Sequence, residues 1–207
     1  MHDLLRKDIG ITTANHATGP EARVAPRFTV LIRAAKLISP EGEFLCVIRD
    51  VSETGLSARI FHPLPECGAM MIELQNGDRY EADLVWQDEE RAGFRFCQPV
   101  DVARVINLPS RFAKRAIRLN IKAPASLIAS LQITPATILD ISQQGAKIAC
   151  DRHFSIDQRI KLAAAGLRET EAKVRWRREG QCGLVFEETF QFGELARIAQ
   201  QLRENTQ

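Results

Sequence analysis

The sequence has little aromatic content and no long apolar run. Only 6% of its 207 residues are Phe, Trp or Tyr, and it contains a single tyrosine. No apolar stretch approaches the roughly 20 residues that a helix needs to cross a bilayer, so we expect no contact with a membrane core. The N-terminal stretch MHDLLRKDIGITTANHATGP also lacks the continuous apolar segment of a signal peptide. We therefore expect a cytoplasmic protein with a flexible tail over residues 1–20.

The residue patterns of common catalytic and metal sites are missing as well. The five cysteines and four histidines do not combine at the spacing of metal ligands. No glycine-rich phosphate loop, no nucleophilic serine on a strand-to-helix turn and no pair of catalytic carboxylates is recognisable. The cysteines are odd in number and scattered along the sequence, which predicts buried free thiols in a reducing compartment rather than a disulfide framework. We expect a protein that is not an enzyme and holds no metal or cofactor.

The charge of the chain is nearly balanced, which bears on its partners. Its 28 Lys and Arg residues against 26 Asp and Glu residues leave a net charge of +2. Proteins that bind nucleic acid usually carry a clear positive patch and, for single strands, exposed aromatic side chains. Lys114, Arg115, Arg118 and Lys122 lie in a stretch free of acidic residues, which could attract a polyanion, but the chain has no strong overall positive charge. Nucleic acid is therefore an unfavoured partner.

An internal repeat with a period of ninety residues organises the chain. The motif Asp-x-Ser-x-x-Gly occurs in RDVSETGLSARI, residues 49–60, and again in LDISQQGAKIAC, residues 139–150. The same shift of ninety residues aligns both tryptophans and both glycines that follow them: Trp86 with Trp176 and Gly93 with Gly183. Because one register holds over about fifty residues, the recurrence indicates a tandem duplication.

Each copy has the pattern of antiparallel strands. RYEADLVWQD places apolar residues at every second position up to Trp86, and ETEAKVRWRRE does the same up to Trp176. This alternation predicts that both tryptophans lie in the core. Six short runs per copy without intervening helices predict a mainly β fold of two tandem six-stranded antiparallel β-barrels, each followed by a short helix. We predict a first domain over 21–107, a linker over 108–113 and a second domain over 114–203.

The repeated motif lies where one predicted strand ends and the next begins, which predicts a hairpin turn. A purely structural interpretation is available, in which Asp and Ser bond to the turn's own amides and Gly supplies a positive φ. A feature upstream favours a binding site instead. Arg23 and Arg27 form Arg-x-x-x-Arg, and Arg27 precedes Asp50 by 23 residues.

The second copy matches this pattern less fully. Arg118 precedes Asp140 by 22 residues, which places Lys114 where the first copy has Arg23. Lysine keeps the charge but lacks the forked donors and the stacking plane of a guanidinium group. The adjacent Arg115 offers a substitute, and with Arg111 it repeats the arginine pair in a shifted register.

The paired motifs, followed in each copy by a Trp and a Gly-x-x-Phe ending, resemble the PilZ domain family over residues 21–107 and 111–203. This resemblance implies a six-stranded β-barrel with a C-terminal helix that binds the bacterial second messenger cyclic di-GMP. It implies a ligand site in the first domain, with arginines on a flexible loop and a turn on the barrel surface: Arg23, Arg27, Asp50, Ser52 and Gly55. Its counterpart in the second domain comprises Lys114, Arg115, Arg118, Asp140, Ser142 and Gly145.

These residue types also suit the ligand on chemical grounds. Guanidinium groups donate in a fork to phosphate and to guanine O6 and N7, and a carboxylate accepts from guanine N1–H and N2–H₂. Three functions remain open. The first is a non-catalytic cyclic di-GMP receptor that relays binding by loop ordering and domain rearrangement to a downstream protein partner. The second is a PilZ-fold interaction module that has lost nucleotide binding in one or both domains, and the third is a nucleic-acid-binding barrel.

Overall fold

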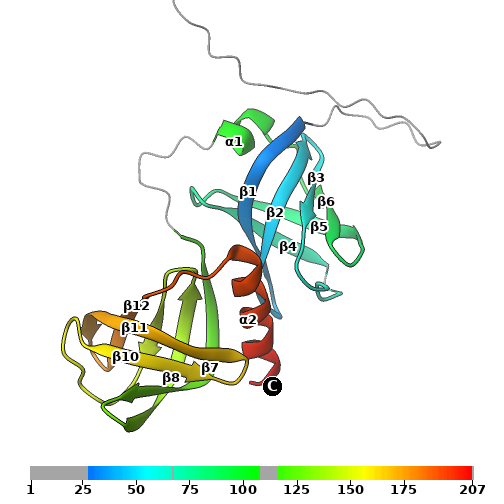
Figure 1. Ribbon diagram of the computed structural model, residues 1–207. Coiled ribbons are helices and arrows are strands. Elements are labelled where there is room, and N and C mark those ends of the chain that lie inside the picture. Colours follow the sequence, from blue (N-terminus) through cyan, green and yellow to red (C-terminus); the bar gives the residue numbers. More distant parts are fainter. Residues whose placement is uncertain (1–27, 67, 108–115, 207) are drawn as a thin grey trace, which may run out of the picture.

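The computed structural model describes residues 28–66, 68–107 and 116–206, which form two closed β-barrels (Figure 1). The predicted fold class is confirmed, because each barrel has six antiparallel strands and is followed by a helix. The first barrel comprises β1 (Phe28–Ser39), β2 (Gly42–Ser52), β3 (Gly55–Arg59), β4 (Ala69–Leu74), β5 (Arg79–Gln87) and β6 (Arg91–Phe96), followed by α1 (Val102–Asn107). The second comprises β7 (Arg118–Ala129), β8 (Gln132–Ser142), β9 (Gly145–Ala149), β10 (Arg159–Ala164), β11 (Leu167–Arg178) and β12 (Gln181–Phe186), followed by α2 (Phe192–Glu204).

The two barrels share one topology, as the repeat predicts. The order around the first is β1-β2-β3-β6-β5-β4, and the second has the equivalent order β7-β8-β9-β12-β11-β10. Closure leaves each barrel without a free sheet edge. The interior of each barrel is filled by aliphatic and aromatic side chains from alternate strand positions. The motif hairpins β2–β3 and β8–β9 therefore occupy equivalent places on two similar scaffolds.

The two tryptophans lie on the outer surfaces of the barrels, so the prediction that they are buried is wrong. Trp86 is 41% exposed and Trp176 is 42% exposed. A register irregularity after Leu84 and another after Val174 each insert one residue and reverse the alternation of the strand. Each tryptophan then pairs across the sheet with a glycine and covers it, because a Cβ on Gly93 would lie 2.1 Å from Nε1 of Trp86. The conserved spacing of Trp and Gly within the repeat thus reflects an outer-surface contact.

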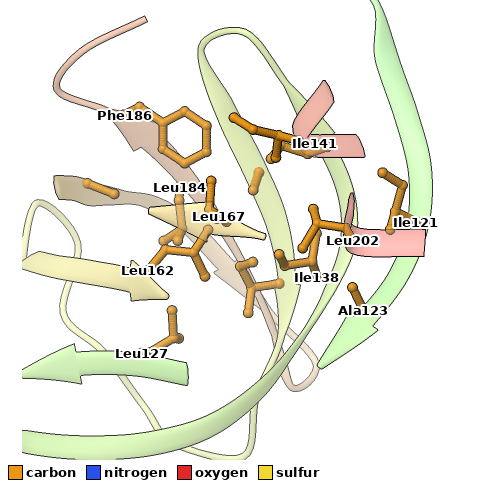
Figure 2. Packing of buried hydrophobic residues seen from close by; sticks show 14 of the residues in the cluster. Ile121, Ala123, Leu127, Ile138, Ile141, Leu162, Leu167, Leu184, Phe186 and Leu202 are labelled. Carbon is orange, nitrogen blue, oxygen red and sulfur yellow. The ribbon is translucent and has the colours of Figure 1, made fainter. Parts of the chain in front are cut away.

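The second barrel is completed by α2, which joins its core. The helix begins after Gln191, whose backbone N–H donates to the Glu194 carboxylate at 3.3 Å. Figure 2 shows Leu202 of this helix among the strand side chains, including Ile121 and Ile138. The helix buries one apolar face, formed by Leu195, Ala196, Ile198, Ala199 and Leu202.

Helix α2 also contacts the first barrel, and Figure 1 shows it between the two barrels beside β7 and close to β2. Leu45 of β2 is only 1% exposed because it packs into the apolar cluster of the second barrel. Arg203 stacks its guanidinium 4.4 Å from the ring centroid of Phe44 and donates to the Glu43 carbonyl at 2.7 Å. The Glu43 carboxylate accepts from the backbone and side chain of Asn120 at 2.8 and 2.7 Å. Apolar burial and charge-assisted hydrogen bonds therefore both hold the barrels together at this junction.

Over the described ranges, no helix is long and apolar enough to span a bilayer. Within the same residues, no three His, Cys, Asp or Glu side chains form a group that could bind a metal ion.

Candidate ligand-binding hairpins

The motif forms a tight hairpin turn in each barrel, as predicted. In the first barrel β2 ends at Ser52 and β3 begins at Gly55, and these two residues pair across the turn. The Ser52 hydroxyl donates to the Gly55 carbonyl at 3.1 Å, and Ser142 donates to Gly145 in the same way at 3.1 Å. Both serines are buried. Their hydroxyls thus close the turn, and the oxygen of each retains lone pairs that can accept a further hydrogen bond.

The glycine of the motif is required by a close approach between strands. A Cβ on Gly55 would lie 2.4 Å from the carbonyl oxygen of Phe94 on β6, and one on Gly145 would lie 2.0 Å from the carbonyl oxygen of Leu184 on β12. Neither glycine has a positive φ. The interpretation that Gly supplies a left-handed backbone is therefore wrong. The neighbouring strand, β6 or β12, leaves no space for a side chain at the motif glycine, so the strand that begins there can lie close to it.

The aspartate of the motif faces the neighbouring strand on the outside of the first barrel. Asp50 is opposite Ser57 in the β2–β3 register, and the Ser57 hydroxyl donates to its carboxylate. Sequence reasoning missed Ser57, because nothing in the motif marks a residue two positions after the glycine. In the second barrel the residue opposite Asp140 is Lys147. The two turns therefore differ in the residue beside their carboxylate.

In the second barrel the structure brings the motif together with an arginine. Nη1 of Arg118 lies 2.7 Å from Oδ1 of Asp140, and Arg118 pairs with Ser142 in the β7–β8 register. Arg118, Asp140, Ser142 and Gly145 thus lie close together where β7, β8 and β9 meet, and their role in binding stays a prediction. The remaining basic residues assigned from the sequence lie outside the described residues: Arg23, Arg27, Lys114 and Arg115.

The chemistry that these hairpins offer is recognition by hydrogen bonds. Each turn presents a carboxylate, an acceptor for ligand N–H groups, beside a serine oxygen and a strand end. Two buried thiols of the barrels, Cys46 and Cys182, are poor nucleophiles. Burial raises the pKa of Cys46 to about 12, and burial together with the nearby Cys150 raises that of Cys182 to about 12 as well.

A cavity of about 710 Å³ lies between the β4–β5 turn and α1, and its lining residue Val100 donates its backbone N–H to the Glu53 carbonyl of the first motif turn at 2.9 Å. Its main charged groups satisfy each other, because Arg104 donates twice to Asp78 at 2.9 Å. This contact lowers the pKa of the Asp78 carboxyl. Arg104 and Asp78 therefore offer no unpaired charge to a ligand in this cavity.

Comparison with known proteins places the chain in a family. The model of the PilZ domain matches residues 21–108 and again residues 109–204, so two copies cover nearly the whole sequence. The chain belongs to the PilZ domain family. The resemblance drawn from the sequence motifs is confirmed.

Several solved structures align with most of the chain at low sequence identity. PlzA of Borreliella burgdorferi, in complex with cyclic di-GMP, has 13% identity and a TM-score of 0.35, over 83% of this chain and 87% of that one. The Bacillus subtilis inhibitor of motility MotI/DgrA has 12% identity and a TM-score of 0.35, over 86% and 98%. YcgR of Escherichia coli, in complex with cyclic di-GMP, has 12% identity and a TM-score of 0.33, over 83% and 81%. The comparison with curated proteins gave no match.

Proposed function

We propose that this PilZ protein is a non-catalytic receptor for cyclic di-GMP and that its first domain is the main binding site. The proposal is supported by two PilZ domains, each with the Asp-x-Ser-x-x-Gly motif on a barrel-surface turn. The observation that carries it is the contact of 2.7 Å between Arg118 and Asp140. This contact brings an arginine of the upstream basic motif to the aspartate of the Asp-x-Ser-x-x-Gly motif.

The contact in the second barrel indicates how the first site would be built. Phe28 pairs with Val51, and Leu119 pairs with Ile141 at the equivalent place. Arg27 directly precedes Phe28 in the sequence, as Arg118 precedes Leu119. Arg118 is the first residue of β7, and Arg27 comes one residue before β1; the first residues of both strands pair with the strand that ends at the motif turn.

In the first site we assign each residue a role from its chemistry. The Asp50 carboxylate accepts hydrogen bonds from guanine N1–H and N2–H₂, while Arg23 and Arg27 donate in a fork to phosphate or to guanine O6 and N7. Ser52 fixes the turn and offers an acceptor oxygen, and Gly55 lets the turn approach β6. None of these roles requires bond making or breaking.

In the second domain, we propose a weaker site or one that serves another role. Lys114 replaces one arginine of the pair, and Arg118 already engages the Asp140 carboxylate. A ligand there would have to exchange this ion pair for its own contacts. These two observations favour the alternative that the second barrel acts as an interaction module without nucleotide.

For the relay, we propose that the ligand orders the segment before β1 and changes the contacts between the barrels. A change of angle between them would break the bonds from Asn120 to Glu43 and would expose Leu45. Hydrogen exchange with and without cyclic di-GMP tests the relay. Protection over residues 20–30 and 108–118 is expected, and protection confined to 20–30 would mean that the barrels do not rearrange.

The binding proposal is tested by calorimetric titration with cyclic di-GMP, with GMP and with single-stranded DNA. The receptor function predicts saturable binding of cyclic di-GMP only. Tighter binding of single-stranded DNA would support the nucleic-acid alternative, and absence of binding by all three would support the interaction module. If cyclic di-GMP binds, we propose that the receptor passes the signal to a downstream protein partner.

A further inference from the structure

The motif aspartate of each barrel is placed by an irregularity in the strand that leads to it. The register shifts between Ile48 and Asp50 in the first barrel and between Ile138 and Asp140 in the second, so one extra residue precedes each aspartate. Bulges of this kind re-aim a side chain, and here Asp50 becomes the direct partner of Ser57 on β3. The same bulge in both barrels thus brings the aspartate opposite the second residue after the motif glycine.

In the first barrel, Ser57 is held where it orients the Asp50 carboxylate. Its neighbours along β3 are buried in the barrel core, so Ser57 itself faces outward. Its hydroxyl donates to Oδ2 of Asp50, and on its other side it pairs with Gly93 of β6, which the indole of Trp86 covers. A carboxylate has about four acceptor positions, and a hydroxyl uses one of them without neutralising the charge. Ser57 therefore orients the carboxylate and leaves it an anion.

In the second barrel, Lys147 occupies the place of this serine. It is opposite Asp140 in the β8–β9 register, and on its other side it pairs with Gly183, which the indole of Trp176 covers. Asp140 also contacts Arg118 at 2.7 Å. One carboxylate thus lies between two cationic residues, whereas the serine of the first barrel adds no charge. Both cationic side chains compete with the N–H groups of a ligand for the carboxylate.

This difference bears on which base each hairpin can recognise. The guanine edge offers N1–H and N2–H₂ as donors, which match a carboxylate, whereas adenine has an acceptor at N1 beside its N6 donor. An anionic acceptor therefore favours guanine over adenine. Lysine and arginine instead favour phosphate groups, which cyclic dinucleotides share whatever their bases. A lysine opposite the aspartate thus exchanges recognition of the base for attraction to the phosphates.

We propose that the residue opposite the motif aspartate sets the base selectivity of each hairpin. Ser57 is a positioning residue that makes the Asp50 carboxylate selective for guanine, and Lys147 removes this selectivity from the second hairpin. The inference rests on the proposed receptor function, and it adds to that site a residue outside the Asp-x-Ser-x-x-Gly motif. Two turns with the same backbone register therefore differ in the ligand that they recognise.

The test compares cyclic di-GMP with cyclic di-AMP, which has the same phosphate ring but carries adenine. Calorimetry on the full chain gives a dissociation constant for each ligand, and the ratio of the two constants measures base selectivity. Ser57→Ala is expected to weaken binding of cyclic di-GMP about three- to tenfold, the effect of one hydrogen bond, and to change that of cyclic di-AMP less. Ser57→Lys, which copies the second barrel, is expected to lower the selectivity further. Ser57→Thr keeps the hydroxyl and should keep the ratio.

The reciprocal substitution tests Lys147 in the full chain. It is made in the Lys114→Arg variant, which restores the arginine of the first copy. Amide chemical shifts of residues 140–147 report binding at the second hairpin. Adding Lys147→Ser is expected to bring these shifts to half-saturation at an about threefold or more lower concentration of cyclic di-GMP. Lys161→Ser, which removes a lysine paired with Glu169, is the control and should change nothing. No gain from Lys147→Ser would overturn the role of this lysine.

The outcomes separate this inference from the receptor function on which it rests. If the unmodified chain binds cyclic di-GMP and Ser57→Lys keeps both its affinity and its selectivity, the inference fails while the receptor function stands. A lowered melting temperature in Ser57→Ala with an unchanged ratio would overturn it as well, because Ser57 would then be a structural residue of β3. If the unmodified chain binds no cyclic di-GMP, the receptor function fails and the inference fails with it.

Discussion

The guanidinium of Arg118 lies 2.7 Å from the carboxylate of Asp140, so the acceptor of the second motif already holds a cation. The Arg118 side chain is 59% exposed but the Asp140 side chain is only 15% exposed, so this ion pair is partly shielded from water. A ligand at this turn would have to exchange the ion pair for its own contacts with Asp140. The lysine at position 114, in place of a forked donor, is a second difference between the two domains.

The substitution Lys114→Arg is expected to raise the affinity of the second domain for cyclic di-GMP. A forked donor contributes roughly 1–3 kcal/mol at a guanine or phosphate contact, which is about ten- to a hundredfold in affinity. Calorimetry should show the stoichiometry rising from one site toward two. Lys122→Arg is the matched control in the same basic stretch. An unchanged stoichiometry in Lys114→Arg would show that another feature disables the second site.

The substitution Gly55→Ala is expected to destabilise the first barrel. Its Cβ would lie 2.4 Å from the Phe94 carbonyl oxygen, so β3 and β6 must separate, at a cost of about 1–3 kcal/mol in the free energy of unfolding. Urea denaturation measures the loss. Gly68→Ala is the control, because nothing lies within 4 Å of a Cβ at that position. Equal stability of the two variants would refute the close-approach explanation.

Much of the fold was predictable from the sequence, because the repeat and the alternation of apolar residues are local patterns. The position of Trp86 was not, since one inserted residue in the strand reverses which side chains face the core. The reason for Gly55 depends on a strand that begins 36 residues later along the chain, at Arg91, and Leu45 is buried only because another domain covers it. Side-chain partners such as Ser57 likewise follow from register, which no short motif encodes.

The substitution Glu43→Ala is expected to loosen the junction between the barrels. The carboxylate of Glu43 accepts two hydrogen bonds from Asn120 and lies 3.2 Å from Nζ of Lys36, whose side chain is only 9% exposed. Removing it takes two charge-assisted hydrogen bonds from the exposed Asn120 and one of two ion pairs from Lys36, which keeps Glu73 at 3.1 Å, at a cost of about 1–3 kcal/mol. Small-angle scattering should show a larger radius of gyration, and melting should separate into two transitions. Glu41→Ala, on the exposed β1–β2 turn, is the control; a compact Glu43→Ala variant would mean that apolar contacts alone hold the junction.

Acidification is expected to weaken the first barrel near the junction through His62. Burial lowers the pKa of this imidazole, which packs against Phe44 and whose Nδ1 lies 3.0 Å from the Pro63 carbonyl. The unfolded chain then binds a proton at a higher pH than the folded chain does. Stability contributed by the neutral ring is therefore complete above the ordinary pKa of 6.5 and is lost as the pH falls below it toward the folded value.

Thermal unfolding between pH 7.5 and 5 measures this effect. His62→Gln should flatten the dependence on pH over that range, whereas His153→Gln, at an exposed position, should leave it as in the unmodified chain. If both variants keep the same slope, groups other than His62 control the acid sensitivity.

The most direct test of the receptor function is calorimetric titration of cyclic di-GMP into the unmodified chain, Arg27→Ala, Asp50→Ala and the control Asp83→Ala, which alters a surface carboxylate of β5. We predict that Arg27→Ala and Asp50→Ala each lose about ten- to a hundredfold in affinity, from roughly 1–3 kcal/mol per contact, while Asp83→Ala binds normally. Melting temperatures of all four proteins should stay similar. A lowered melting temperature in Asp50→Ala with unchanged affinity would contradict the account and would make the motif a structural turn.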